Sequence, residues 1–297
     1  MRTYLNTYSV RLAFASLLLA VLTLASGFSF AGNPKEASSL LWKIEGKGLQ
    51  KPSYLFGTVH MICSENFVMP EKVKKAIQQT GQTYLEIDLS SPNFAAESQK
   101  YMMSERSISS QISKQDSAFV DSVMIVKLGV SLAQYNQVKP MILVAAIMRK
   151  IITCPLVSFE SEIIKLTAEK SHKVQGLSSI EEQYSFLEKV FDTKDLPAFL
   201  KDIDHLEMSD VFAKIYKYYK VENLAGINEL VAEFSTTNPE GYRQLLPVRN
   251  HLWADRIPAI IKNTPTFIGI GCGHLSGEEG IINLLRKKGY KVTPVLN

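Results

Sequence analysis

Two glycine-histidine motifs near opposite ends of the chain are the residues best suited to chemistry. Residues 57–60 spell Gly-Thr-Val-His and residues 271–274 spell Gly-Cys-Gly-His, so both follow the pattern Gly-x-x-His. Two neutral imidazoles and one carboxylate suit a divalent transition metal and leave coordination positions open for water or substrate. Glu86 offers a carboxylate from a third segment. We therefore expect His60, Glu86 and His274 to bind a Mn, Co or Zn ion.

Such an ion would lower the pKa of its bound water and polarise a carbonyl group, which is the chemistry of hydrolysis. The simpler interpretation of either motif alone is a histidine hydrogen-bonded in a turn. Likewise, Glu86 on its own fits a solvated strand residue. The common zinc signature His-Glu-x-x-His is absent from the sequence, so the metal-site hypothesis depends on these three side chains meeting.

A basic helix face is a second candidate for chemistry. Arg249, Trp253 and Arg256 fall at i, i+4 and i+7 in a helical stretch, which places them on one face. A basic face that includes an aromatic ring can bind a carboxylate or another substrate anion. The alternative is an ordinary salt-bridged surface.

The elements that must position these residues alternate between strands and helices. Residues 40–45 and 53–58 are predicted to be two strands joined by a Gly- and Pro-rich turn. Residues 84–89 form a predicted strand with Glu86 on one face, and residues 266–270 form a buried strand. Ligands in open α/β sheets bind where strands end. Strand ends can therefore present both imidazoles to one crevice.

Most of the remaining chain is helical by pattern. A helix is expected to begin near Pro70, and a capping box at Ser179 opens another. Further segments are assigned as helices over 93–152, 160–171, 194–263 and 278–288, and as strands over 173–177 and 291–296. This order favours a parallel sheet closed by a βαβ crossover. We expect one α/β domain over residues 32–297, with a central, mostly parallel sheet, flanking helices and a helical insertion.

The first residues have the layout of a secretory signal. Two arginines are the only charges before Lys35, and residues 12–25 are apolar. Small residues near the end of this stretch predict cleavage after Ala31, which makes residues 1–31 a signal peptide and the mature protein periplasmic or secreted. The alternative is an uncleaved anchor, because residues 12–34 are uncharged and long enough to span a bilayer.

Charge gives no argument for a nucleic-acid partner. The chain has a formal charge of +4, and removal of the predicted signal takes away two arginines and no acid, which leaves +2. No later apolar run reaches spanning length, so we expect no stable membrane span after signal cleavage. The expected partner is a peptide or small-molecule substrate, and the sequence does not indicate an oligomeric state.

Three cysteines in an exported chain leave one unpaired. Cys272 lies between two glycines of the second motif, where a tight turn is badly placed for a bridge. We therefore expect Cys63 to pair with Cys154 and to close a loop of about 90 residues, contributing about 3–4 kcal/mol on the loop-entropy model. The alternative is three buried thiols.

The ordered set of motifs resembles the TraB/GumN family, which includes the animal Tiki metalloproteases. The resemblance is carried by residues 41–44, 54–60, 176–177, 181–183, 249–253 and 269–295. It implies an α/β fold like that of erythromycin esterase and the haem-binding ChaN proteins. It also implies a site formed by His60, Glu86 and His274, with Arg249 and Asn250 matching a further motif.

In Tiki proteins the activity is metal-dependent peptide cleavage, so the resemblance implies an exported metal-dependent hydrolase with Glu86, Arg249 and Asn250 as catalytic groups. Two residues depart from the family pattern: Ser178 stands where an acid is usual, and Cys272 stands where a small residue is usual. A competing hypothesis is a non-catalytic protein that holds haem or another small ligand, for which a nearby carboxylate is not needed. A third is a scaffold with an empty site.

Overall fold

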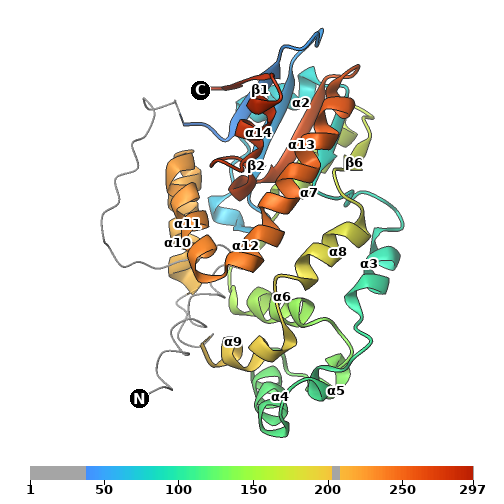
Figure 1. Ribbon diagram of the computed structural model, residues 1–297, viewed down its shortest axis with the longest axis vertical. Coiled ribbons are helices and arrows are strands. Elements are labelled where there is room, and N and C mark those ends of the chain that lie inside the picture. The colour runs from blue at the N-terminus through green and yellow to red at the C-terminus, as the bar shows by residue number, and fades with distance from the viewer. Residues whose placement is uncertain (1–37, 203–207, 297) are drawn as a thin grey trace.

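The computed structural model describes residues 38–202 and 208–296, and it is built around one large sheet (Figure 1). The predicted signal peptide, residues 1–31, lies outside the described residues. The sheet has six strands in the order β6-β4-β7-β2-β1-β8. These strands are β1 Leu41–Glu45, β2 Ser53–Thr58, β4 Gln82–Leu85, β6 Val174–Gly176, β7 Thr266–Gly271 and β8 Lys291–Pro294.

The sheet is mostly parallel, as predicted. Strands β2, β7, β4 and β6 run in one direction, and β1 is antiparallel to both of its neighbours, β2 and β8. The register pairs Thr58 with Gly271, and Leu85 with Gly269. The carboxyl ends of the three central parallel strands therefore lie at the same edge of the sheet, where the chain continues into the two glycine-histidine motifs and Glu86.

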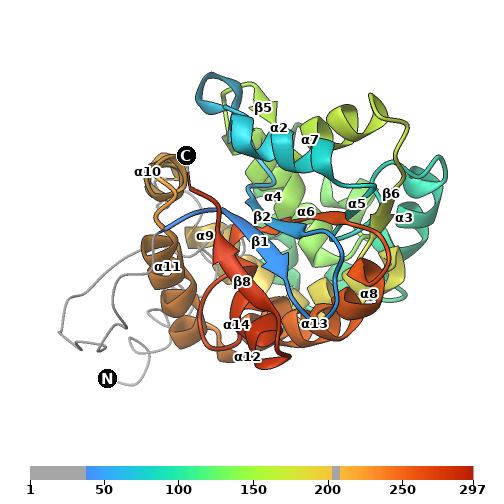
Figure 2. The ribbon, with the colours of Figure 1, turned by 90° about the horizontal axis from the view of Figure 1, so that it is seen from above.

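Helices cover both faces of the sheet (Figure 2). Helices α2 (Glu71–Gln79) and α7 (Phe159–Ala168) lie on one side, and α13 (Pro247–Ile261) and α14 (Ile281–Lys287) lie on the other. The reason is visible in α2, whose apolar side chains recur at helical spacing and are all buried: Val73, Ala76 and Ile77. The sequence predicted this helix from the same three residues.

The predicted helical insertion forms a second packed region beyond the carboxyl edge of the sheet (Figure 1). It contains α3 (Phe94–Met102), α4 (Lys114–Leu128), α5 (Leu132–Tyr135), α6 (Pro140–Ile151) and α9 (Leu196–Asp202). Leu143, Ile147 and Phe199 belong to its hydrophobic core, which is separate from the core of the sheet. Val59, next to His60, packs against both cores. The first glycine-histidine motif therefore lies at their junction.

The remaining helices connect the insertion to the sheet. They are α8 (Ile180–Glu188), α10 (Met208–Lys220), α11 (Leu224–Thr237) and α12 (Pro239–Leu245). Helix α8 begins with the predicted capping box, in which Ser179 and Glu182 bond to each other's backbone N–H groups. In the described residues, no helix is both long and apolar enough to cross a membrane.

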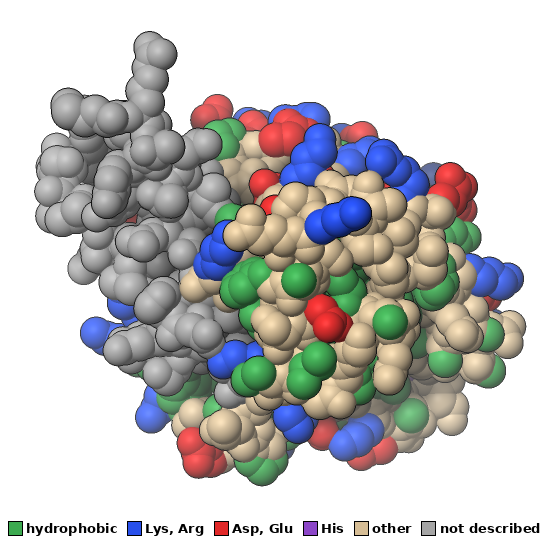
Figure 3. Space-filling model, turned by 90° about the horizontal axis from the view of Figure 1, so that it is seen from below, with side chains coloured by type: hydrophobic (Ala, Val, Ile, Leu, Met, Phe, Trp, Pro, Cys, Tyr) green, Lys and Arg blue, Asp and Glu red, His purple; other side chains and the backbone are tan. Residues whose placement is uncertain are grey.

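At the end of the molecule formed by the insertion, apolar side chains lie scattered among polar ones (Figure 3). Exposed residues of α4 include Ile125 and Val126. Single apolar side chains are common on protein surfaces, so this face does not by itself indicate a docking site.

Several predicted elements differ from the structure; the helix predicted over 278–288 is Ile281–Lys287, and the strand predicted over 291–296 ends at Pro294. Strand β4 ends at Leu85, so Glu86 follows the strand and does not lie within it. The N–H of Gly271 donates to the Glu86 side chain at 2.8 Å, which joins the ends of β7 and β4. The closing βαβ unit also spans more of the sheet than expected, because β2 and β1 separate β7 from β8.

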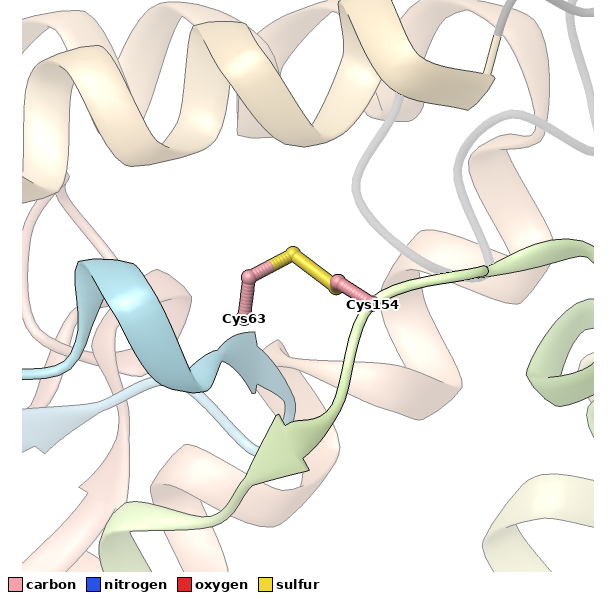
Figure 4. Close-up of a disulfide and its surroundings, with 2 residues drawn as sticks. All are labelled: Cys63 and Cys154. Carbon is pink, nitrogen blue, oxygen red and sulfur yellow. A yellow bond between two sulfur atoms is a disulfide. The ribbon is translucent and has the colours of Figure 1, made fainter.

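A small second sheet holds the segment after His60. Strands β3 (Ile62–Cys63) and β5 (Leu156–Val157) pair antiparallel. The predicted disulfide joins Cys63 to Cys154 beside this ladder, with the two Cα atoms 5.6 Å apart (Figure 4). Cys272 is buried and free, also as predicted.

Candidate functional site

The carboxylate of Glu86 lies between the two predicted histidines. Its Oε1 atom is 3.7 Å from Nε2 of His60 and also 3.7 Å from Nε2 of His274. The three residues follow the carboxyl ends of β2, β4 and β7. The structure therefore brings together, at one edge of the sheet, the three side chains that the sequence singled out.

The first glycine of each motif has a steric reason. A Cβ atom on Gly57 would lie 2.6 Å from Cδ1 of Leu275 and 3.1 Å from Cα of Cys272, so glycine lets the ends of β2 and β7 approach. A Cβ atom on Gly271 would lie 3.2 Å from Oε1 of Glu86 and 3.4 Å from Nε2 of His60. Glycine at position 271 therefore keeps space open beside the donor atoms.

His274 is buried and held on several sides. Its Nδ1 atom lies 2.6 Å from the side-chain oxygen of Asn250, and its ring packs against Trp253 with the centroids 4.7 Å apart. Because an amide oxygen only accepts, Nδ1 carries the proton and Nε2 presents its lone pair toward the site. Burial, reinforced by the adjacent Arg249 charge, lowers the pKa of His274 to about 3, which keeps the ring neutral.

His60 lies on the side of the site that faces solvent, because its side chain is 60% exposed. Its Nδ1 atom donates to Oε1 of Glu160 at 2.9 Å, so its Nε2 atom is the one near Glu86. Desolvation lowers the pKa of His60, but the carboxylates of Glu160 and Glu86 outweigh it and raise this pKa to about 9.

Glu86 is buried with Arg249, and the two side chains form an ion pair. Burial would raise the pKa of Glu86, but Arg249, together with His60, His274 and the Gly271 N–H, outweighs this and holds that pKa well below its usual range. The other Arg249 hydrogen bonds go to His274 Nε2 at 3.2 Å, to Gln183 Oε1 at 2.8 Å and to the Leu245 carbonyl at 3.2 Å. The buried Nε atom of Arg249 has no hydrogen-bond partner among the described residues.

The donor set suits a metal ion in its chemistry and comes close to one in its spacing. Across the described ranges, no group of three or more His, Cys, Asp or Glu side chains is arranged to hold an ion. Ligands of a tetrahedral ion lie about 3.4 Å apart when its bonds are about 2.0–2.1 Å long, against 3.7 Å for both histidine–Glu86 pairs. The Nε2 lone pair of His274, the ionised carboxylate and the space beside Gly271 suit a small ion after a slight contraction. At His60, an ion would first have to displace the Nε2 proton that the ring carries below its pKa of about 9. Binding at His274 would displace an N–H of Arg249.

Two residues of the predicted basic face on α13, Arg249 and Trp253, are buried, whereas Arg256 is partly exposed and salt-bridged. Trp253 is fully buried beneath the Arg249 guanidinium, and Arg256 forms a salt bridge with Glu182 at 2.6 Å. Ser178, the departure from the family pattern, accepts the indole N–H of Trp253 at 2.9 Å. The serine is therefore used to hold the aromatic ring that supports His274.

Two polar residues at this site were not assigned a role from the sequence. Gln183 lies in a segment that carries the family resemblance, and it accepts a hydrogen bond from Arg249. Glu160 lies at the start of α7, and only its place in a predicted helix was visible in the sequence. Its contact with His60 joins residues 100 positions apart, for which no local pattern gives a signal.

Comparison with known proteins agrees with these motifs. The model described as "TraB/PrgY/gumN family" matches residues 40–294, a range that includes all the strands of the large sheet and both glycine-histidine motifs. No curated protein and no solved structure gives a significant match. A match over nearly the whole described chain is sufficient for assignment, and the protein belongs to the TraB/PrgY/gumN family.

Proposed function

We propose that this protein is an exported hydrolase that uses a divalent transition metal to cleave a peptide or a related amide. The observation that carries the proposal is the position of the Glu86 carboxylate, 3.7 Å from the Nε2 atoms of both His60 and His274. These are nitrogen and oxygen donors of the kind that Mn, Co and Zn ions take. A bound ion would supply a water of lowered pKa and would polarise the scissile carbonyl.

The surrounding residues would orient these donors. Glu160 and Asn250 accept from the Nδ1 atoms of the two histidines, so the Nε2 atoms are the ones turned toward an ion. Binding would displace the Arg249 N–H at His274 and, below a pKa of about 9, a proton at His60. Because His60 is the exposed member of the set, substrate would approach from its side. Arg249 is the proposed group for stabilising negative charge in the transition state. Its unpartnered Nε atom is the donor that remains for this role.

Export is supported by the Cys63–Cys154 disulfide, because such bonds persist in oxidising compartments. Periplasmic or secreted location, and the signal peptide over residues 1–31, form part of the proposal. The same holds for the finer fold assignment to the architecture of erythromycin esterase and ChaN proteins.

Metal content tests the proposal directly. Purified protein, supplemented in turn with Mn, Co and Zn and then freed of loose ions, is expected to retain one ion per chain by elemental analysis. His60→Ala and His274→Ala should lose that ion. His251→Ala is the matched control, because His251 is exposed and pairs with Glu279 on the surface.

A wild-type protein that retains no stoichiometric ion would remove the basis of the hydrolase proposal. A loaded protein should also cleave a mixed peptide library, with the two site variants inactive. If haem instead gave a Soret band that either histidine variant abolished, the binding-protein hypothesis would replace this one.

A further inference from the structure

The strongest feature not yet assigned a role is the buried carboxylate that contacts His60. Glu160 is 4% exposed and accepts three side-chain hydrogen bonds. They come from the His60 ring at 2.9 Å, the Thr58 hydroxyl at 2.5 Å and the Ser158 hydroxyl at 2.7 Å. A buried carboxylate is costly unless its oxygens are satisfied. Of these three partners, only the imidazole can carry a positive charge.

The two histidines are held very differently. His274 is buried against Trp253 and hydrogen-bonded on both ring nitrogens. His60 is 60% exposed, and among the described residues Glu160 is the hydrogen-bond partner that fixes its ring. An exposed ring without such a partner would rotate and would exchange its proton between the two nitrogens. The orientation of His60 therefore depends on one contact far more than that of His274.

We propose that Glu160 is a positioning residue that keeps the proton of neutral His60 on Nδ1 and aims Nε2 at Glu86. The part of this inference in which Nε2 of His60 binds a metal rests on the proposed function. A carboxylate that accepts from the far nitrogen of a ligand histidine fixes its tautomer and raises its basicity, and removing one typically weakens metal binding 10- to 100-fold. Glu160 cannot share an ion with Nε2, because it lies on the opposite side of the ring.

The surrounding backbone is built to hold this pair. Thr58, which donates to Glu160, is two residues before His60, and Ser158 is two residues before Glu160. Between these points the β3–β5 ladder and the disulfide join the two segments. The carboxylate and the ring are therefore attached to the same local framework, so their separation changes little when the rest of the chain moves.

The test uses nitrogen-15 NMR of ring-labelled histidine in the metal-free protein, at a pH where His60 is neutral, with His60→Ala for assignment. In the wild type, the proton is expected on Nδ1. In Glu160→Ala it should move to Nε2 or be shared between the nitrogens. Competition with a chromophoric chelator should show Zn²⁺ affinity falling about 10- to 100-fold. Glu162→Gln, on the same helix and paired with Lys165 at the surface, should change neither quantity.

If Glu160→Ala fails to fold, Glu160→Gln keeps the shape and should still weaken Zn²⁺ binding about tenfold, because the charge is lost. The proposal is overturned if the wild-type proton lies on Nε2. It is also overturned if a folded Glu160 variant matches the wild type in both tautomer and Zn²⁺ affinity. The tautomer measurement contains no metal, so a wild type that binds no ion would contradict the proposed function while leaving the role of Glu160 to be decided by the NMR result.

Discussion

At the scale of single residues, the candidate site is defined by where protons and charges are held. Asn250 and Glu160 accept from the Nδ1 atoms of His274 and His60, and Arg249 neutralises the buried carboxylate of Glu86. Every side chain in the proposed ligand set therefore has a hydrogen-bond or ion-pair partner. This arrangement distinguishes the site from a pair of turn histidines, which would need no such support.

Gly271→Ala is the sharpest test at this scale. The new methyl group would lie 3.2 Å from Oε1 of Glu86 and 3.4 Å from Nε2 of His60, which fills the space proposed for the ion. The backbone at Gly271 has φ −53°, which alanine adopts readily. We expect metal affinity, measured by chelator competition, to fall about 10- to 100-fold, the range found when a metal site is disturbed by one side chain.

Gly273→Ala, in the same motif, is the matched control. Its methyl group would meet Cγ2 of Val231 at 3.4 Å and none of the proposed ligands, so affinity should stay near the wild-type value. Equal affinity in the wild type and Gly271→Ala would show that an ion does not use this space.

At the scale of elements, the parallel strands bring the three proposed ligands to one edge of the sheet, and a short two-stranded ladder fixes the chain beside them. Strands β2, β4 and β7 end at one edge of the sheet, and each is followed by one of the three proposed ligands. The β3–β5 ladder then fixes the path of the chain after His60. Ligands commonly bind at such edges because strand ends point loops toward a shared crevice.

The disulfide beside that ladder should contribute substantially to stability. It closes a loop between residues 91 positions apart, and removing a bridge of this kind typically costs about 2–5 kcal/mol. The double variant Cys63→Ser/Cys154→Ser is expected to lose this amount of unfolding free energy, measured by urea denaturation. Reduction of the wild type should lower its stability to a similar level. The double variant should be insensitive to the reductant, and a double variant as stable as the oxidised wild type would contradict the prediction.

At the scale of the whole molecule, the site lies between the sheet and the helical insertion. Val59 contacts both hydrophobic cores. On the sheet side, a largely buried ion pair between Lys72 and Glu222 joins α2 to the loop before α11. Lys72 also donates to the Val295 carbonyl at 2.9 Å and to the Ser39 hydroxyl at 3.1 Å. Segments from both ends of the described chain are therefore tied to the loop before α11.

A ligand that joins three distant strand ends should stabilise the whole fold. At 100 times its dissociation constant, an ion that binds only the folded state contributes about 2.7 kcal/mol. For a chain of this size, Tm should then rise by about 5–10 °C. We expect Mn, Co or Zn to produce this shift in differential scanning fluorimetry, and chelation to reverse it. His274→Ala should show no shift, and an equal shift in that variant would place the stabilising ion elsewhere.

The sequence by itself determined the local elements and the motif residues. The first hairpin, helix α2, the capping box at Ser179 and strand β7 follow from periodicity and turn residues within a few positions of each other. The Gly-x-x-His pattern after two predicted strands likewise identified His60 and His274. The disulfide pairing followed by elimination, because the glycines around Cys272 left only one plausible pair.

Only the tertiary structure decided which polar groups meet. In the structure, Glu86 follows the end of its strand. The Glu160 carboxylate accepts a hydrogen bond from His60, and the Ser178 hydroxyl accepts one from Trp253. The tertiary structure also buried Arg249 and Trp253 of the α13 face and left Arg256 partly exposed in a salt bridge, where the sequence had left open an anion site or a salt-bridged surface. The spacing of apolar residues along a segment shows which face of that helix or strand is buried, because each element buries one face against the core. Hydrogen bonds between residues far apart in the chain depend instead on how the helices and strands pack together. Such contacts leave no pattern in the sequence around either partner.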